Sequence, residues 1–139
     1  THIKDLEEIT DKHMDEAEKK SGVKVDKHIV LLCTGFHKRH QNDRTKLVWA
    51  NPQVTVSASE WLFKRGSIMH GVEGPSTDSP DNNDFAQHRY CRDKGITHFE
   101  WLVNLEATLG KGEFEFIGLP IKFKGGSGSP VRAVAIINE

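Results

Sequence analysis

The sequence predicts an α/β protein with a mixed β-sheet. Candidate helices and strands alternate through the first two-thirds of the chain, and the last third is rich in candidate strands. This order of elements is typical of helices packed on a sheet whose strands do not all run the same way. The sequence contains no internal repeat.

The N-terminal part predicts a helix, a strand and a loop. Apolar residues recur at helical spacing among charged ones across residues 3–20, which indicates an amphipathic helix that ends at Gly22. Residues 28–34 are almost continuously apolar, as expected for a strand buried on both faces and ended by Gly35. The polar, unperiodic stretch from there to Pro52 is expected to be a surface loop.

Next comes a short helix, because Ser57 and Glu60 form a capping-box pattern and Gly66 is a candidate C-cap. A strand is expected at residues 67–72, and the following segment, 73–84, is a loop rich in Gly, Pro, Ser and Asp. The remaining elements are predicted from the same signals: a helix at 85–94 closed by Gly95, a short strand at 97–100, a strand-like run near 114–120, a turn at 125–129 and a last strand at 131–137.

The composition limits the possible classes of function. The 139 residues include 19 basic and 20 acidic side chains, for a formal net charge of -1, and the two signs are well mixed. No basic field is present to hold a phosphate backbone, so nucleic acid is not an expected partner. No apolar run approaches the roughly 20 residues that span a bilayer. We therefore expect a soluble protein without a membrane partner, favour the cytoplasm, and leave open a targeting segment lost before Thr1.

Cysteines and histidines are the first candidates for chemistry. Two cysteines are too few for a disulfide framework, and both Cys33 and Cys91 are expected to be structural thiols. Eight histidines invite a metal hypothesis. Most of them are explained more simply as surface or structural side chains, namely His2, His13, His28, His37, His40 and His70.

His88 differs because it lies on the helix that leaves the 73–84 loop, twelve residues before Glu100 at the end of the next candidate strand. A helix followed by a strand can return the chain to the same end of a sheet, where α/β proteins collect ligands. An imidazole and a carboxylate brought together there suit a zinc or manganese ion. The pair also fits a structural helix histidine and a strand-end charge, and the spacing alone leaves both interpretations open.

The loop at residues 73–81 also has two interpretations. Its Asp and Ser side chains can cap backbone groups within a turn. Alternatively, the loop follows a strand directly and lines a pocket at the sheet edge, where amides and hydroxyls hold a carbonyl substrate. The sequence contains no Gly-x-Ser-x-Gly elbow, Gly-Lys phosphate loop, Cys-x-x-Cys pair or His-Glu-x-x-His helix, so those chemistries have no support.

A series of stretches spans nearly the whole chain and matches one known family in order. They are DKHIVLLCTGF (26–36), SEWL (59–62) through Gly66, GVEGPSTD (71–78), DFAQHR (84–89), residues 95–100, FIGLPIK (116–122) and GSPVRA (128–133). Together they resemble the second half of the cyclase family, whose members include bacterial kynurenine formamidases, isatin hydrolases and trans-dienelactone hydrolases. One departure is Glu73-Gly74, which stands where the family often has Asp-Thr.

The resemblance implies a swivelling β/β/α-like domain, of which residues 1–139 form only the C-terminal half. The family's second half contributes a helix histidine and a glutamate twelve residues later, and these fall on His88 and Glu100. Its first half carries a His-x-Gly-Thr-His-x-Asp-x-Pro-x-x-His segment that supplies three metal ligands and an acid/base histidine. That segment is absent here. We therefore expect the N-terminal half to be a separate chain or an omitted part of this one.

The implied activity is that of a metal-dependent hydrolase that is similar to kynurenine formamidase. It acts on a formamide, cyclic amide or lactone carbonyl through a metal-activated water. His88 and Glu100 are the implied ligands of zinc or manganese, and Glu100 is also the implied catalytic proton relay. A small-molecule substrate and a homo-oligomer are implied as well. The alternative is a non-catalytic binding or structural protein on the same fold, which lacks the N-terminal metal motif.

Overall fold

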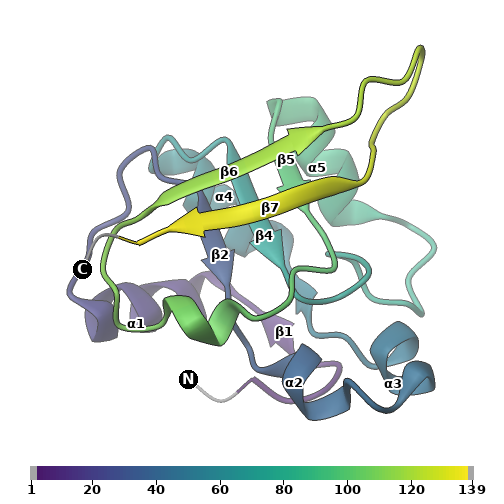
Figure 1. The fold of residues 1–139 in the computed structure, drawn as a ribbon, viewed down its shortest axis with the longest axis horizontal. Coiled ribbons are helices and arrows are strands. Elements are labelled where there is room, and N and C mark those ends of the chain that lie inside the picture. The colour runs from purple at the N-terminus through teal and green to yellow at the C-terminus, as the bar shows by residue number, and fades with distance from the viewer. Residues whose placement is uncertain (1–2, 138–139) are drawn as a thin grey trace. The chain divides into compact units, whose positions relative to one another are not determined.

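The computed structural model describes residues 3–137, which contain helices together with parallel and antiparallel strands (Figure 1). The chain divides into two compact units, residues 1–107 and 108–139. The parallel strand pairs belong to the first unit and the antiparallel pair to the second. The α/β class predicted from the sequence, with strands of both orientations, is confirmed.

The first unit contains most of the regular structure. Its elements in chain order are β1 (Glu8–Ile9), α1 (Asp11–Ser21), β2 (Val30–Leu32), α2 (Phe36–His40), α3 (Arg44–Trp49), β3 (Gln53–Val54), α4 (Val56–Lys64), β4 (Met69–Val72), α5 (Ala86–Lys94) and β5 (Thr97–Phe99). A 3₁₀ helix, η1 (Leu105–Thr108), marks the boundary with the second unit. Strands β2, β4 and β5 form a parallel sheet with β4 in the centre, and β1 pairs with β3 separately.

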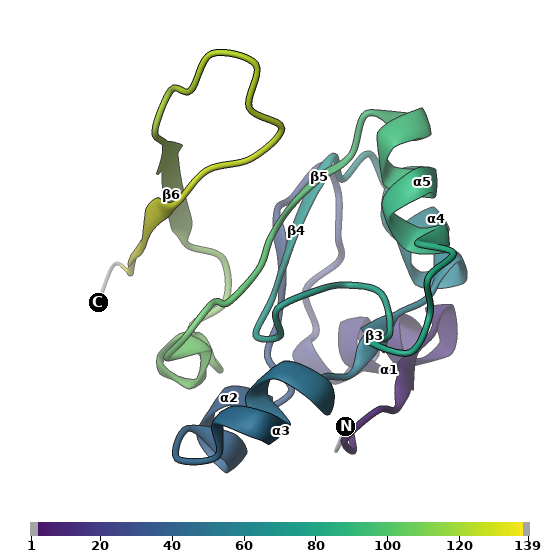
Figure 2. The same cartoon turned by 90° about the vertical axis from the view of Figure 1, so that its right-hand side faces the viewer.

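Helices α4 and α5 lie on one face of the β2-β4-β5 sheet (Figure 2). The main apolar cluster of the first unit comes from the N-terminal segment, α1, α4 and the strands, and its buried members are Ile3, Ile9, Met14, Val54, Ala58, Trp61, Leu62 and Val72. Burying one large aliphatic or aromatic side chain contributes about 1.5–3 kcal/mol. This cluster is therefore a main source of stability for the helices that support α5.

The segment from α5 to β5 follows the sequence-based expectation closely. Helix α5 ends at Gly95, whose φ of 68° is the left-handed conformation that glycine tolerates without a Cβ penalty. The chain then enters β5, which pairs with β4 in parallel and places His98 opposite His70. Glu100 follows β5 directly, so α5 and the end of β5 present His88 and Glu100 from neighbouring elements of the same unit.

Two sequence-based expectations for the N-terminal part are wrong. The helix expected at 3–20 begins only at Asp11, because Thr10 and His13 form a capping box there, with Thr10 N donating to His13 Nδ1 at 3.1 Å. The strand expected to be buried on both faces is shorter, Val30–Leu32, and only partly buried.

The next stretch also departs from expectation. The loop expected up to Pro52 contains the short helices α2 and α3, and Asp43 caps α3 by accepting a hydrogen bond from Lys46 N at 3.1 Å. The cap of α4 is Thr55 rather than Ser57, since the Thr55 hydroxyl accepts from Ala58 N at 3.2 Å. Pairwise capping contacts of this kind are not visible in a polarity pattern.

The histidines expected to be surface or structural side chains lie in different environments. His2 lies outside the described residues. His13 is part of the α1 capping box. His40 is an ion-pair partner rather than a free surface side chain, because its Nε2 lies 2.8 Å from Asp5 Oδ2 and only 11% of its side chain is exposed. His70 is fully buried, as expected for a structural histidine.

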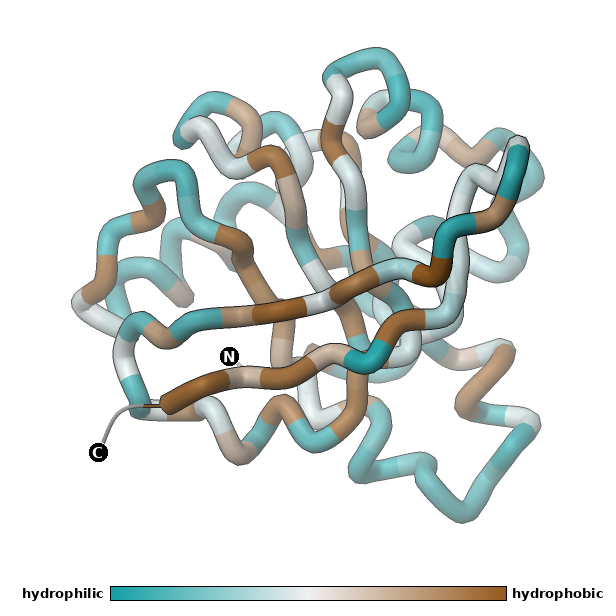
Figure 3. The backbone as a smooth tube through the Cα atoms, turned by 45° about the horizontal axis from the view of Figure 1, so that its top comes forward, coloured by the Kyte–Doolittle hydropathy of each residue, from teal (hydrophilic) through white to brown (hydrophobic). Residues whose placement is uncertain are grey.

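The second unit contains β6 (Glu115–Pro120) and β7 (Val131–Ile136), which pair antiparallel with Phe116 opposite Ala135. Figure 3 shows hydrophobic residues along both strands. Leu119 is 74% exposed and Ile136 is 46% exposed. An isolated two-stranded hairpin is at best marginally stable in water. The assignment of residues 1–139 to one half of a single domain stays a prediction.

Within residues 3–137, no helix combines the length and the apolar character that are needed to cross a bilayer.

Gly71 gives a test of the packing around β4. A Cβ at this position would come within 2.5 Å of Leu102 Cδ1 and 2.9 Å of Leu31 Cδ2. We expect Gly71→Ala to lower the free energy of unfolding by about 1–3 kcal/mol, because overpacking forces neighbours out of their rotamers. Gly128→Ala is the matched control, since a Cβ there has no neighbour within 4 Å. Equal urea midpoints for the two variants would contradict this account.

Candidate metal centre

Three side chains of the first unit converge at the end of β5. They are His88 from α5, His98 from β5 and Glu100 just after β5, and each offers one ligand atom within 4.8 Å of the others. His88 Nε2 lies 3.6 Å from Glu100 Oε1, and His98 Nε2 lies 3.3 Å from the same oxygen. The structure thus brings together the two residues that the sequence paired and adds His98.

His88 is held in place by Asp78, which is 4% exposed. The Asp78 Oδ2 lies 2.5 Å from His88 Nδ1 and also accepts from the His88 backbone amide at 3.1 Å. Its Oδ1 accepts from Gln87 N at 3.0 Å. A carboxylate can only accept, so neutral His88 carries its proton on Nδ1 and leaves Nε2 free to bind. The loop thus caps α5, as one of its two interpretations predicted, and it also orients His88.

The cluster is partly shielded from water, with 16% of the His98 side chain, 31% of Glu100 and 36% of His88 exposed. Glu100 Oε1 is buried and accepts no hydrogen bond of acceptable geometry from the described residues. Burial lowers the pKa of His98, but interactions with Cys91 and Glu100 outweigh burial and raise this pKa to about 9. Cys91 and Glu100 together therefore favour the protonated imidazole of His98.

A layer of buried polar side chains lies behind the cluster. The His70 ring stacks on that of His98 with centroids 5.4 Å apart. Burial, followed by the charges of neighbouring histidines, lowers the pKa of His70 to about 3, so its imidazole is neutral at physiological pH. Gln87 Nε2 donates to Ser59 Oγ at 3.0 Å and to Cys91 Sγ at 3.0 Å. The contact with Ser59 joins α5 to α4.

Sequence reasoning missed His98 and Asp78. A signal for His98 existed, because it precedes Glu100 by two residues in a candidate strand and alternate residues of a strand share a face. Asp78 had only a weak signal, its place in a turn before a helix. Its role depends on a contact across ten residues, which composition does not reveal.

A second group, Cys33, Glu73 and Glu106, also has spacing compatible with metal ligands, but its geometry is structural. Glu73 is 2% exposed and accepts from Thr34 N at 2.6 Å, Thr34 Oγ1 at 2.7 Å and Phe36 N at 3.3 Å. These bonds close the turn between β2 and α2 and occupy the carboxylate. Burial, together with the charge of Glu73, raises the pKa of Cys33 to about 11, consistent with the expected structural thiol.

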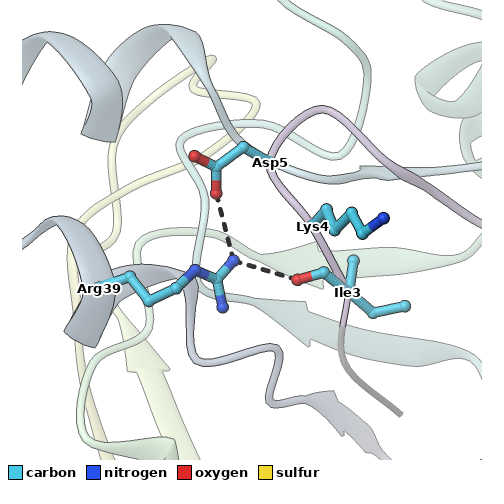
Figure 4. Close-up of a pocket in the computed structure, with 4 residues that line it drawn as sticks. All are labelled: Ile3, Lys4, Asp5 and Arg39. Atoms are coloured by element: carbon cyan, nitrogen blue, oxygen red, sulfur yellow. Dashed lines mark hydrogen bonds and ion pairs between the residues drawn. The ribbon is translucent and has the colours of Figure 1, made fainter.

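A cavity of about 520 Å³ lies elsewhere in the first unit, lined by Ile3, Lys4, Asp5 and Arg39 (Figure 4). The Arg39 guanidinium spans it by donating to Ile3 O at 3.1 Å and to Asp5 Oδ1 at 3.3 Å. None of its lining residues belongs to the His88 cluster. The cavity is therefore not the site of the chemistry expected from His88 and Glu100.

Comparison with known proteins adds independent information. The family model named Cyclase matches residues 1–79. A kynurenine formamidase of Salinibacter ruber is 39% identical over 73 residues, which cover 52% of this chain and 34% of the relative. A kynurenine formamidase of Bacillus thuringiensis is 34% identical over 105 residues, which cover 76% of this chain and 47% of the relative.

A solved structure, isatin hydrolase A from Labrenzia aggregata, superposes with a TM-score of 0.81 at 25% identity, covering 98% of this chain and 56% of that one. The chain thus spans about half of that structure and at most about half of the two formamidases. His88 and Glu100 lie beyond the residues that the family model matches.

The Asp78 contacts predict a large effect of a single substitution. We expect Asp78→Ala to lower the free energy of unfolding by about 1–3 kcal/mol, because it leaves two amides and an imidazole without their acceptor. Asp81→Ala is the control, since the Asp81 side chain is exposed in the same loop. Urea titrations compare the variants, and equal losses would contradict the capping role.

The raised pKa of Cys33 predicts slow alkylation. Its rate with iodoacetamide, followed by peptide mass spectrometry, should stay low near neutral pH and rise toward pH 11, where the thiolate forms. In urea the same cysteine should titrate near the reference value of about 8.5. A folded-state profile identical to that of the unfolded chain would show that neither burial nor Glu73 protects the thiol.

Proposed function

Because the chain belongs to the cyclase family, we propose that it supplies part of the active site of a metal-dependent hydrolase that acts on a formamide, cyclic amide or lactone carbonyl. The observation that carries this proposal is the approach of His88 Nε2 to within 3.6 Å of Glu100 Oε1. The similarity to kynurenine formamidases and to an isatin hydrolase supports a small carbonyl substrate.

His88 and Glu100 have the donor chemistry that a divalent ion requires. His88 would bind through Nε2 as a neutral imidazole, with Asp78 fixing its tautomer in the manner of carboxylate–histidine–metal arrangements. Within residues 3–137, the Glu100 oxygen that faces His88 is buried and accepts no hydrogen bond of acceptable geometry, which fits a carboxylate whose partner is a cation. One imidazole and one carboxylate suit zinc and manganese alike.

The bound ion would supply a water of lowered pKa and polarise the carbonyl oxygen. Glu100 is 31% exposed, so its second oxygen can take the proton of the attacking water and return it to the leaving amine or alcohol. His88 would keep its proton on Nδ1 throughout, because Asp78 accepts from that atom. Asp78 therefore acts as a positioning residue, and Glu100 as the catalytic acid and base.

We further propose that residues 1–139 form the C-terminal half of one cyclase-like domain, completed by an N-terminal half on a separate chain or on a longer form of this one. The chain covers 47% of a formamidase relative and 56% of a solved isatin hydrolase, which is the share expected of a half domain. Homo-oligomerisation and a cytoplasmic location remain predictions.

Substitution of the two proposed ligands tests the assignment. In the complete assembly, His88→Ala and Glu100→Gln should each abolish hydrolysis and reduce zinc or manganese occupancy, while circular dichroism shows that folding is kept. His13→Ala is the histidine control. It should retain metal and activity and lose only about 1 kcal/mol of stability, because His13 belongs to the α1 capping box.

Metal analysis of the purified variants shows whether His88 and Glu100 bind the divalent ion. Full occupancy in both His88→Ala and Glu100→Gln would rule out this site. Wild-type protein that takes up no divalent ion would instead favour the non-catalytic binding or structural protein.

A further inference from the structure

We propose that Asn51 is a positioning residue for His88 and Glu100, and that it acts through residues 74–78, which we call the 74–78 loop. This inference rests on the proposed function, because it takes His88 and Glu100 as metal ligands. It goes further in assigning a role to a buried side chain that lies between α3 and β3, outside both elements that carry those ligands.

The loop is bonded to both sides of the proposed site. At its end, Asp78 engages the Nδ1 atom and the backbone amide of His88. At its start, the carbonyl oxygen of Gly74 accepts a hydrogen bond from the amide of Trp101 at 2.9 Å, and Trp101 directly follows Glu100. The separation of 3.6 Å between His88 Nε2 and Glu100 Oε1 therefore depends on where this loop lies.

Asn51 holds the second half of the loop through its side-chain amide. Only 1% of the residue is exposed, and its Nδ2 atom donates to Ser76 O at 3.0 Å and lies 3.5 Å from Asp78 O. Both neighbours are carbonyl oxygens, which identifies the nitrogen as the atom that faces the loop. An amide nitrogen has two N–H donors and can be shared between them, whereas an aspartate carboxylate could only accept.

Steric contact fixes the start of the loop against the same side chain. A Cβ added at Gly74 would come within 2.7 Å of Asn51 Cβ, so glycine lets the loop backbone lie directly on Asn51. Between these contacts, Thr77 is fully buried and its carbonyl oxygen accepts from Val54 N at 2.7 Å. The loop is thus held at successive positions by the segment that runs from Asn51 into β3.

The other end of the Asn51 amide is unfavourably placed. Its Oδ1 atom is buried and has no hydrogen-bond partner among residues 3–137. A buried acceptor without a donor is destabilising, and an apolar side chain of similar shape would avoid it. The donor on Nδ2 is therefore the feature that distinguishes Asn51 from an apolar residue. The competing interpretation is that Asn51 only stabilises the turn, so that the folded site would not depend on it.

The first test reads the His88 imidazole in the complete assembly without metal. With ¹⁵N-labelled histidine, NMR distinguishes the protonated from the unprotonated ring nitrogen, and the His88→Ala spectrum assigns the signals. In the wild type, neutral His88 should keep its proton on Nδ1, because Asp78 accepts from that atom. Asn51→Ala and Asn51→Leu both remove the donor, and the second keeps most of the volume. Each should populate both tautomers.

The second test measures zinc affinity in the same proteins. Asn51→Ala should weaken binding by about 10-fold, since loss of an outer partner of a metal ligand costs about 10–100-fold. In an Asp78→Ala background the same substitution should change the affinity by less than about 2-fold, because both side chains act through one contact. Asp43→Ala is the matched control. It removes the cap of the neighbouring helix α3 but should keep the wild-type tautomer and zinc affinity.

The outcomes separate this inference from the proposed function. A single Nδ1-protonated tautomer in both Asn51 variants, with zinc affinity within about 2-fold of the wild type, would overturn the positioning role. A loss of about 10-fold in the Asp78→Ala background would also overturn it, because Asn51 would then act by another route. Zinc binding that His88→Ala and Glu100→Gln leave unchanged would instead refute the proposed function, while the His88 tautomer would still decide the role of Asn51. If Asn51→Ala fails to fold, Asn51→Leu and Gly74→Ala, which displaces the loop from its own side, answer the same question.

Discussion

The Asp78 carboxylate joins the loop after β4 to the first turn of α5, and the geometry of the cluster depends on it. One oxygen accepts from the amide of Gln87 at 3.0 Å, and the other accepts from the amide of His88 at 3.1 Å. A negative charge at a helix N-terminus is favoured by the exposed amides and by the helix dipole. The same carboxylate engages His88 Nδ1, so the bonds that start the helix also fix which imidazole nitrogen faces Glu100.

The second constraint is the register of the parallel sheet. Strand β5 pairs with β4 so that His98 lies opposite His70. A slip by one residue would turn every side chain of β5 to the other face. The side chains of His98 and Glu100 would then both point away from His88. Gly71, which closely approaches Leu31 and Leu102, lies opposite Phe99 in the same register and leaves room for neighbouring side chains to pack over β4.

The elements that carry the cluster were predictable because their signals are local. Helix α5 is a polar segment closed by Gly95, and β5 follows at once, so the sequence placed His88 and Glu100 on neighbouring elements. Asp78 was not predictable as a partner of His88, because the contact crosses a loop whose path composition does not determine. Likewise, α2 was missed because its start depends on Glu73, a distant residue whose carboxylate accepts from Phe36 N and His37 N.

The charges around the cluster explain why a divalent ion suits it. Asp78 and Glu100 together carry two formal negative charges when both are ionised. His70 does not offset this charge, because burial keeps it neutral with a pKa of about 3. Interactions with Cys91 and Glu100 raise the pKa of His98 to about 9, yet Glu100 Oε1 accepts no hydrogen bond of acceptable geometry from the described residues. A bound 2+ ion would offset the charge of both carboxylates, that of Glu100 directly and that of Asp78 through the His88 imidazole. The neutral polar layer behind the cluster would add no opposing charge.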